Sequence, residues 1–366
     1  MSEILGIVTG GPGDARRLRT LAAALPYGLV LEEVDRSLPR AESARRIRRA
    51  LASRRWPLVV LEGTGIAGGL SVIRSARRAG TPYVVSSGDP IGGFFRTVKG
   101  PVAGRLFERY ERSLYRNSAG YVGWSPYLTG MAISMGAPRG VTVEGGVDLR
   151  AFGVASDADR AAARRSFGIA PDHLVLGVVG SLKWTERQQY CYGLELVEAL
   201  RRVRRTDATV MIVGDGDGRS QLEARVHPEL KSRVVLTGKL PADEVPRALQ
   251  AFDVGFVTQT LDGLGSYRLT TKLPEYLAAG VPVAMSPIPG YFDYVGDAGW
   301  PLPEGHPASA TFHDELAGWI DDLDAGAVSA RRAPARAAAE ARFNYDVLSR
   351  RFASFIEHIL AVTSTR

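Results

Sequence analysis

The amino-acid sequence predicts an α/β protein with two doubly wound, Rossmann-like lobes. A chain of 366 residues favours two domains of ordinary size over one. Short apolar runs alternate with helical patterns from end to end, and such alternation forms parallel sheets with helices on both faces. Right-handed crossovers then wind each half of the chain around its own sheet. The predicted regions are a first lobe at 1–150, a linker at 151–172, a second lobe at 173–344 and a C-terminal helix at 345–366.

The strands of the first lobe are predicted from runs rich in Val, Ile, Leu and Tyr. They are Ile4–Val8, Leu29–Val34, Leu58–Leu61, Tyr83–Ser86 and Gly120–Gly123. The intervening helices fall around residues 15–24, 42–53, 69–79 and 101–116. The second of these has Ala44, Ile47 and Leu51 on one face and arginines on the other, as expected of a helix that covers a sheet.

The second lobe repeats this rhythm after a stretch rich in Ala, Arg and Asp. Its predicted strands are Leu174–Val179, Thr209–Val213, Val234–Leu236, Val254–Val257 and Val281–Met285. The last predicted helix, Tyr345–Val362, has an apolar stripe through Leu348, Phe352 and Leu360. We expect this helix to pack back on the first lobe.

The composition is that of a soluble globular protein, with 45% hydrophobic and 23% charged residues. Cys191 is the only cysteine, so an intrachain disulfide is impossible and a reducing compartment is expected. The N-terminus does not have the pattern of a signal peptide, and no apolar run approaches the roughly 20 residues needed to span a bilayer. These features predict a cytoplasmic protein.

The net charge of +7 is unevenly distributed. Residues 1–150 contain 22 Lys and Arg against 12 Asp and Glu, a balance of +10, and the remainder contains 24 against 27, a balance of −3. A basic first lobe suits solvated helix faces, a phosphorylated acceptor or peripheral contact with an anionic membrane. Aromatic residues do not alternate with the basic ones, which argues against a nucleic-acid partner.

The segment 270–283 combines a helix start, a carboxylate and a helix stop. Thr270 or Thr271 is expected to cap the helix, and Gly280 fits the left-handed conformation that ends helices. Glu275 therefore lies one turn from a helix N-terminus, at the sheet edge where open α/β sheets bind ligands. The carboxylate could instead serve only the helix dipole, and geometry leaves both interpretations open.

Three further loops of the second lobe follow predicted strands. The first, 180–187, carries the cations Lys183 and Arg187, which could clamp a diphosphate. The second, 214–218, has paired aspartates but lacks calcium-loop spacing, so we interpret it as a turn rather than a metal site. The third, 262–271, is rich in small residues and ends at a helix start, and is the best phosphate-binding candidate.

The first lobe offers two candidate loops. A glycine-rich turn at 9–14 contains Gly11, but Arg16 stands where a nicotinamide-binding fingerprint needs its third glycine, so a tight turn bordering a cleft is favoured. Asp89 follows the fourth strand and could orient or deprotonate an acceptor hydroxyl, or simply form an Asp-Pro turn. The next loop, with Phe94 and Phe95, is a candidate acceptor or membrane contact.

Two other classes of enzyme fit the sequence poorly. None of the five histidines is spaced for zinc, and a single cysteine cannot form a thiolate cluster. A Ser-His-Asp hydrolase lacks its Gly-x-Ser-x-Gly elbow.

Together these motifs resemble the retaining glycosyltransferases of the GT-B fold, and family 4 most closely. The similarity runs through both lobes and is strongest between residues 178 and 289. It rests on the segments 179–187, 212–216, 235–240 and 272–283 in the second lobe and 125–128 and 144–148 in the first. The resemblance implies two lobes facing across a cleft and a glutamate, here Glu275, that binds the ribose of a sugar nucleotide.

Several positions depart from the family pattern. Gly88 stands where a histidine often precedes the aspartate, and Gly145 replaces an asparagine. Tyr267 replaces a glutamate eight residues before Glu275, and Ser181 takes one place of the usual basic pair. The resemblance therefore implies nucleotide binding more directly than it implies the catalytic residues.

The resemblance implies transfer of a sugar from a nucleoside diphosphate (UDP, GDP or dTDP) to an acceptor, with retention of configuration and without a metal or cofactor. The acceptor could be a small molecule, a glycan or a lipid-linked sugar. The implied catalytic residues are Asp89, Arg187 and Lys272, the acceptor residues are Phe94 and Phe95, and the donor-binding residues are Gly11, Ser181, Lys183, Thr237, Gly238, Thr270, Thr271 and Glu275. A sugar-nucleotide epimerase and a catalytically altered sugar-nucleotide-binding protein are the alternatives.

Overall fold

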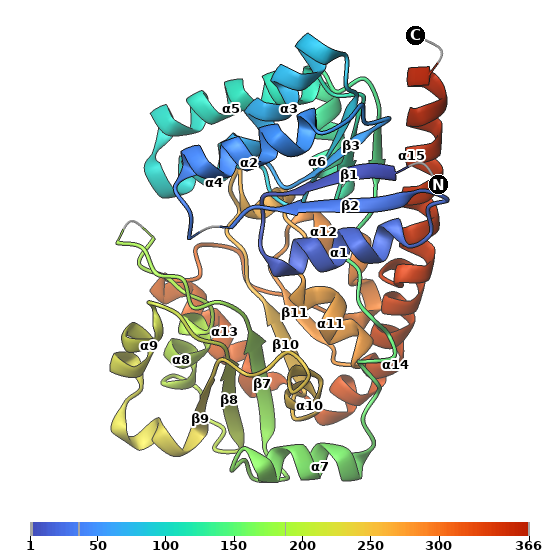
Figure 1. Cartoon of the computed structure of the whole chain (residues 1–366). Coiled ribbons are helices and arrows are strands. Elements are labelled where there is room, and N and C mark those ends of the chain that lie inside the picture. The colour runs from blue at the N-terminus through green and yellow to red at the C-terminus, as the bar shows by residue number, and fades with distance from the viewer. Residues whose placement is uncertain (1–2, 36, 187, 365–366) are drawn as a thin grey trace. The chain divides into compact units, whose positions relative to one another are not determined.

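The computed structural model describes residues 3–35, 37–186 and 188–364, which form two compact units (Figure 1). Unit 1 comprises residues 1–146, 267–269 and 345–366, and unit 2 comprises 147–266 and 270–344. Each unit is built around its own sheet, and both sheets are wholly parallel in the strand pairs described. The predicted fold class, two doubly wound Rossmann-like lobes, is therefore confirmed.

Within its described residues, unit 1 contains a six-stranded sheet of order β2-β1-β3-β4-β5-β6. The strands are β1 Glu3–Val8, β2 Gly28–Glu33, β3 Val59–Glu62, β4 Tyr83–Ser87, β5 Gly120–Gly123 and β6 Gly140–Thr142. The helices are α1 Pro12–Ala22, α2 Arg40–Ala52, α3 Ile66–Ala79, α4 Ile91–Lys99, α5 Pro101–Arg116, α6 Pro126–Ser134 and α15 Tyr345–Ser364. The sequence predicted all of these strands except β6, which has only three residues.

Side chains of the unit 1 strands alternate between two separate cores. Ile4 and Val60 belong to a cluster that includes residues of α1 and α15, whereas Leu5 and Val59 belong to a cluster with residues of α2, α3 and α5. Successive strand residues point to opposite faces, so both faces of the sheet are covered by helices. Helix α15 contributes its apolar stripe to the first cluster, beside α1 (Figure 1).

The segment around Phe94 is helical, and its prediction as a loop was wrong. Residues Ile91–Lys99 form α4, whose first N–H groups are capped from another helix. The buried carboxylate of Glu111 accepts hydrogen bonds from the N–H groups of Ile91 (2.8 Å) and Gly92 (2.9 Å). A cap supplied from outside the segment leaves no signal in its own sequence.

The described part of unit 2 holds the second sheet, ordered β12-β11-β10-β7-β8-β9. The strands are β7 Leu174–Val179, β8 Ala208–Val213, β9 Val234–Gly238, β10 Val254–Val257, β11 Val283–Met285 and β12 Gly299–Pro301. The helices are α7 Asp157–Ser166, α8 Leu194–Leu200, α9 Arg219–Arg225, α10 Val245–Gln250, α11 Lys272–Ala278, α12 Pro289–Tyr294, α13 Ala310–Asp322 and α14 Ala325–Arg342, with 3-10 turns η1 Pro228–Arg233, η2 Gly265–Tyr267 and η3 Gly296–Ala298. The three-residue strand β12 is the one that the sequence did not indicate.

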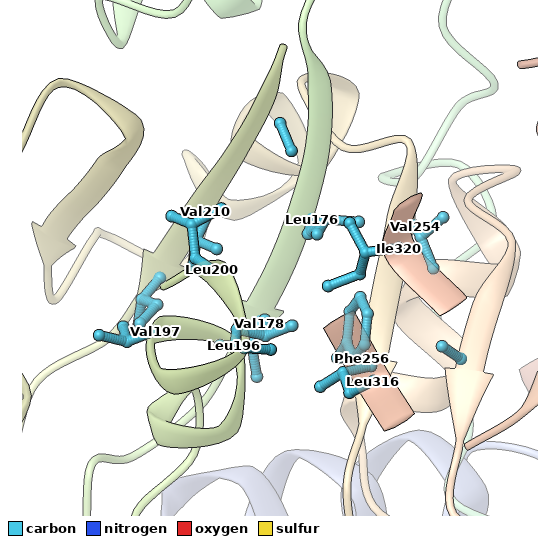
Figure 2. Close-up of a cluster of buried hydrophobic side chains, with 14 of the residues drawn as sticks. Leu176, Val178, Leu196, Val197, Leu200, Val210, Val254, Phe256, Leu316 and Ile320 are labelled. Carbon is cyan, nitrogen blue, oxygen red and sulfur yellow. The ribbon is translucent and has the colours of Figure 1, made fainter. Parts of the chain in front are cut away.

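The core of unit 2 lies between the central strands and helices α8 and α13 (Figure 2). Val178 of β7 lies beside Leu196 of α8, whereas Leu176 of β7 and Phe256 of β10 lie beside α13. This apolar layer fixes β7 and β10 at the centre of the sheet, so the loops that follow them have rigid attachment points.

Helix α7 occupies the middle of the segment predicted as a linker. Ser156 caps it in a capping box with Asp159. Its residues Arg160 and Arg164 donate to the carboxylate of Asp253, at 2.6 and 2.5 Å, just before β10. These ion pairs tie α7 to unit 2.

Candidate functional site

Half of the predicted donor-binding residues lie at the carboxyl ends of strands in unit 2, and three more lie at the start of α11. Ser181 and Lys183 follow β7, and Thr237 and Gly238 close β9. The chain reaches α11, with Thr270, Thr271 and Glu275 at its start, after leaving β10. Gly11 is an exception, because it belongs to unit 1. Arg187 lies outside the described residues.

The loops after β7, β8 and β9 are joined by backbone hydrogen bonds. The N–H of Leu182 donates to the carbonyl of Asp215 at 3.0 Å, and the N–H of Gly218 donates to the carbonyl of Leu182 at 2.8 Å. The N–H of Gly214 donates to the carbonyl of Gly238 at 2.9 Å. The three strand ends therefore form one continuous rim, which is the usual ligand-binding edge of an open α/β sheet.

The aspartate-rich loop 214–218 is a turn that anchors its neighbour. Asp217 accepts hydrogen bonds from Lys183 Nζ and the N–H of Trp184, both at 2.7 Å. These donors hold the pKa of Asp217 below its usual value. Among the residues that the structure describes, no group of three His, Cys, Asp or Glu side chains is arranged to hold a metal ion.

Neither threonine caps α11, so that part of the prediction was wrong. Thr271 has helical dihedrals (φ −60°, ψ −25°) and makes no capping hydrogen bond, because a cap needs an extended backbone at that position. The hydroxyl oxygen of Thr270 is buried and forms no hydrogen bond to any residue that the structure describes. Gly280 does adopt the predicted left-handed conformation, with φ +67°.

Helix α11 is fixed to β7 by a buried tyrosine. Tyr276 accepts a hydrogen bond from the N–H of Val179 at 2.7 Å, at the last residue of β7. Lys272 and Glu275 are three residues apart and so share a face of the helix. Glu275 is half-buried, whereas Lys272 is only 5% exposed.

The ammonium of Lys272 lies at the carboxyl end of β7. Its Nζ is 3.1 Å from the centroid of the Tyr192 ring. A Cβ at Gly180 would lie 3.1 Å from the same Nζ, so glycine leaves room for the ammonium at the strand end. The structure thus brings together Lys272 and the loop that contains Ser181.

Two of the predicted donor-binding residues have polar groups that already form hydrogen bonds within the protein. The Thr237 hydroxyl donates to the carbonyl of Gly238 at 2.8 Å. The N–H of Gly11, at the N-cap of α1, donates to the carboxylate of Asp14 at 2.8 Å. A carboxylate at this N–H takes the place that a phosphate would otherwise occupy.

In unit 1, Asp89 has a partner that the sequence did not reveal. Arg268 Nε donates to its carboxylate at 2.6 Å. Arg268 lies in the segment 267–269, and the hydroxyl of Ser125 donates to the carbonyl of Tyr267 at 2.8 Å. The two residues of the ion pair are 179 positions apart in sequence, so no local pattern could have linked them.

Gly88 and Gly145, two positions that depart from the family pattern, face the same indole. A Cβ at Gly88 would lie 2.8 Å from Trp124 Cδ2, and one at Gly145 would lie 3.1 Å from Trp124 Cε3. The Arg17 guanidinium lies over the ring, with 4.5 Å between its carbon and the ring centroid. Trp124 therefore fills the space into which side chains at positions 88 and 145 would extend.

A buried ion pair underlies this end of the unit 1 sheet. Arg17 (2% exposed) donates to both carboxylate oxygens of Glu62 (1% exposed) at 3.2 Å. It also donates to Ser86 Oγ at 3.1 Å and to the carbonyl of Val143 at 2.6 Å. Burial raises the pKa of Glu62, and the charge of Arg17 opposes that rise. Arg17 therefore connects β3, β4 and the end of β6. The sequence did not single out Arg17, because its sequence context resembles that of the exposed arginines around it.

The predicted acceptor residues lie on α4. Phe94 is 41% exposed, and Phe95 stacks on Phe107 of α5 with 3.6 Å between ring centroids. Phe94 therefore offers an apolar surface, whereas Phe95 mainly holds α4 and α5 together.

Comparison with known proteins gives matches in both units. Residues 6–144 match the family described as glycosyl transferase 4-like domain, and residues 173–322 match the family described as glycosyl transferases group 1. A curated relative, the 2-deoxystreptamine glucosyltransferase of Streptomyces kanamyceticus, is 29% identical over 255 residues, which cover 66% of this chain. The match spans 63%, less than two thirds, of that relative's length.

Solved structures share the fold along nearly the whole chain. HepE from Anabaena in complex with UDP-glucose has a TM-score of 0.71 at 16% identity, covering 97% of this chain and 99% of that one. A glycosyltransferase from Rickettsia africae has a TM-score of 0.73 at 14% identity, covering 98% of each chain.

None of the helices in the described residues has the length and apolar character needed to cross a membrane.

Proposed function

Because this chain belongs to the glycosyltransferases of the GT-B fold, we propose that it transfers a sugar from a nucleoside diphosphate to an acceptor. The observation that carries the proposal is the pairing of a buried cation, Lys272, with a half-buried carboxylate, Glu275, on one face of α11. A sugar nucleotide needs both groups, because its diphosphate is anionic and its ribose presents hydroxyl donors.

In the proposed donor site, Glu275 binds the ribose hydroxyls and Lys272 binds the diphosphate. Ser181, which is exposed, lies on the same rim, and Thr237 and Gly238 border the nucleoside two strands away. Thr270, whose buried hydroxyl has no hydrogen bond among the described residues, contributes a donor to the phosphate oxygens. Lys183 can join them only by leaving Asp217, and Arg187 adds a second cation from the same loop.

The proposed site stabilises the negative charge that develops on the leaving diphosphate. As the glycosidic bond breaks, negative charge grows on the phosphate oxygens, and a preorganised cation is most effective where water is excluded. We propose that the departing phosphate accepts the proton of the acceptor on the same face of the sugar, so that configuration is retained. This mechanism requires neither a metal nor a strong protein base, and it fits a glycine at position 88.

Unit 1 is proposed to bind the acceptor. Asp89, oriented by Arg268, can accept a hydrogen bond from an acceptor hydroxyl, and Phe94 offers an apolar contact. Small-molecule, glycan and lipid-linked acceptors all suit a basic unit with an exposed aromatic residue. We propose a cytoplasmic enzyme that reaches a lipid-linked acceptor, where it has one, by peripheral contact through unit 1.

Measurement of nucleotide binding tests the proposed donor site. Isothermal titration with UDP, GDP and dTDP should reveal one preferred nucleotide, and we expect UDP because HepE binds UDP-glucose. Glu275→Ala should weaken the binding of that nucleotide by about 1–3 kcal/mol, the cost of leaving a buried hydrogen-bonding group without its partner. Glu304→Ala, which removes an exposed carboxylate from the same unit, is the matched control and should bind normally.

Two results would contradict this assignment. Failure of the wild-type protein to bind any of the three nucleotides would overturn the donor site. Unchanged affinity in Glu275→Ala would leave Glu275 with no role beyond the helix dipole.

A further inference from the structure

We propose that Tyr192 and Glu195 are positioning residues that hold the ammonium of Lys272 at the carboxyl end of β7. The part played by Lys272 in transfer rests on the proposed function, but the placement of its side chain is argued from contacts alone. Lysine has four flexible side-chain bonds, so a lysine that acts on a diphosphate must be restrained by its surroundings to be preorganised.

Tyr192 provides the restraint from one side. The Lys272 ammonium is 3.1 Å from the ring centroid, a distance at which the negative face of the ring attracts a cation. The hydroxyl of Tyr192 also accepts a hydrogen bond from Gln259 Nε2 at 3.3 Å. Gln259 is itself held at the end of β10, where its N–H donates to Ser286 Oγ at 2.8 Å.

Glu195 holds the segment that carries Tyr192, because its carboxyl binds the residues on either side of that ring. It lies in the first turn of α8 and is 0% exposed. Its carboxylate accepts hydrogen bonds from Thr258 Oγ1 at 2.6 Å, from Tyr190 OH at 3.0 Å and from the N–H of Gly193 at 3.0 Å. Burial raises the pKa of Glu195, while these donors and the charge of Lys272 favour its ionised form.

Lys272 is buried, so its charge needs partners within the protein. An ionised lysine or glutamate that is buried alone pays a large desolvation penalty, which an opposite charge and hydrogen bonds reduce. The absence of a Cβ at Gly180 leaves the remaining side of the ammonium facing the strand end. The arrangement therefore presents a fixed positive charge at the edge where the diphosphate is proposed to bind.

Nuclear magnetic resonance can read the position of Lys272 without any ligand. The chain contains five lysines, so a protein labelled with 13C at the lysine ε-carbon gives a simple spectrum, and Lys272→Arg assigns the signal. We expect the ε-methylene protons of Lys272 to be shifted upfield by the Tyr192 ring. The shift should be lost in Tyr192→Leu and Glu195→Gln and kept in Tyr192→Phe.

Glu198→Gln is the matched control. Glu198 lies one turn along α8, is also buried, and pairs with Arg225 at 3.0 Å instead of approaching Lys272. This variant should keep the upfield signal even if its thermal stability falls. An ordinary chemical shift for Lys272 in the wild-type protein, or an unchanged shift in Glu195→Gln, would overturn the proposal.

A double-mutant cycle on UDP affinity then separates positioning from general structural support. If Glu195 acts through Lys272, Glu195→Gln should weaken UDP binding by about 10-fold in the wild-type background and have no further effect in Lys272→Ala. Equal losses in both backgrounds would contradict positioning. If the wild-type protein fails to bind UDP, GDP and dTDP, the proposed function fails, and the NMR result still decides whether Tyr192 and Glu195 hold the lysine.

Discussion

At the scale of single residues, Trp124 restricts the size of the side chains that its neighbours can carry. Its indole is buried against the Arg17 guanidinium on one face and lies within van der Waals distance of Gly88 and Gly145. A larger residue at either glycine would have to displace a ring that has little room to move. The two glycines are therefore linked to the tryptophan, although they lie on different loops.

Replacement of Gly88 by alanine tests this link. The added Cβ would lie 2.8 Å from Trp124, so we expect the free energy of unfolding to fall by about 1–3 kcal/mol, as for other overpacked sites. Gly130→Ala in α6 is the control, because a Cβ there meets nothing within 4 Å and alanine favours helices. Chemical denaturation measures both; a Gly88→Ala protein as stable as the wild type would show that the indole moves freely.

Sequence reasoning at this scale identified residues but seldom their partners. Lys272 and Glu275 were predicted as site residues because they belong to one motif, and their roles are proposals. Arg268, the partner of Asp89, and Tyr192, beneath Lys272, are supplied by distant segments, and contacts of that kind depend on how the loops close. The predicted capping by Thr270 or Thr271 was wrong because α11 begins with Thr271 already in a helical conformation.

At the scale of elements, strands and helices with continuous apolar patterns were predictable. The missed strands β6 and β12 are three residues long, too short to show a period. Helix α4 was missed because it begins Ile-Gly-Gly, two glycines being poor helix formers, and because Glu111 of α5 supplies its cap. These three elements depend on tertiary contacts for their stability, whereas α7, predicted as part of a linker, has a local capping box of Ser156 and Asp159.

The loop after β7 is an element whose order should depend on Asp217. Asp217→Ala removes the acceptor of both Lys183 Nζ and the Trp184 N–H, so hydrogen exchange at the Trp184 amide should become several-fold faster. Asp243→Ala, which removes an exposed aspartate before α10, should leave that amide unchanged. Equal exchange in all three proteins would mean that the loop is held by other contacts.

Acid should have a similar effect on this loop in the wild-type protein. The pKa of Asp217 is held below its usual value of 3.8 by Lys183 and the Trp184 N–H. A carboxyl with a lowered pKa stabilises the folded loop above the unfolded value and loses that effect as the pH falls through the lowered value. The Trp184 contact should therefore persist at pH 5 and above and be lost only below pH 3.8.

Helix α15 is expected to be integral to unit 1. Phe352 is fully buried in the cluster shared with α1, so Phe352→Ala should lower the free energy of unfolding by about 3–5 kcal/mol. Glu357→Ala lies on the exposed face of the same helix and should change it little. Similar stabilities for the two variants, measured by thermal unfolding, would show that the helix does not contribute to that core.

At the scale of the whole molecule, two units of one architecture differ in charge and in the groups at their strand ends. The basic unit 1 presents Asp89, Arg268 and Phe94, whereas unit 2 presents Lys272 and Glu275 on α11. The fold class followed from the alternation of strands and helices alone. Assignment of the donor to unit 2 and the acceptor to unit 1 is a proposal that requires a catalytic assay.

The most direct test of sugar transfer is an assay of product formation with UDP-glucose labelled with 13C at the anomeric carbon. Purified protein, the labelled donor and a pool of sugar, aminocyclitol and lipid-linked acceptors should yield a product that contains the label, detected by mass spectrometry. The anomeric coupling constant of that product should match that of the donor, as retention requires, and Lys272→Ala should abolish its formation. A product of inverted configuration would contradict the mechanism, and isomerised donor formed without any acceptor would contradict glycosyl transfer itself.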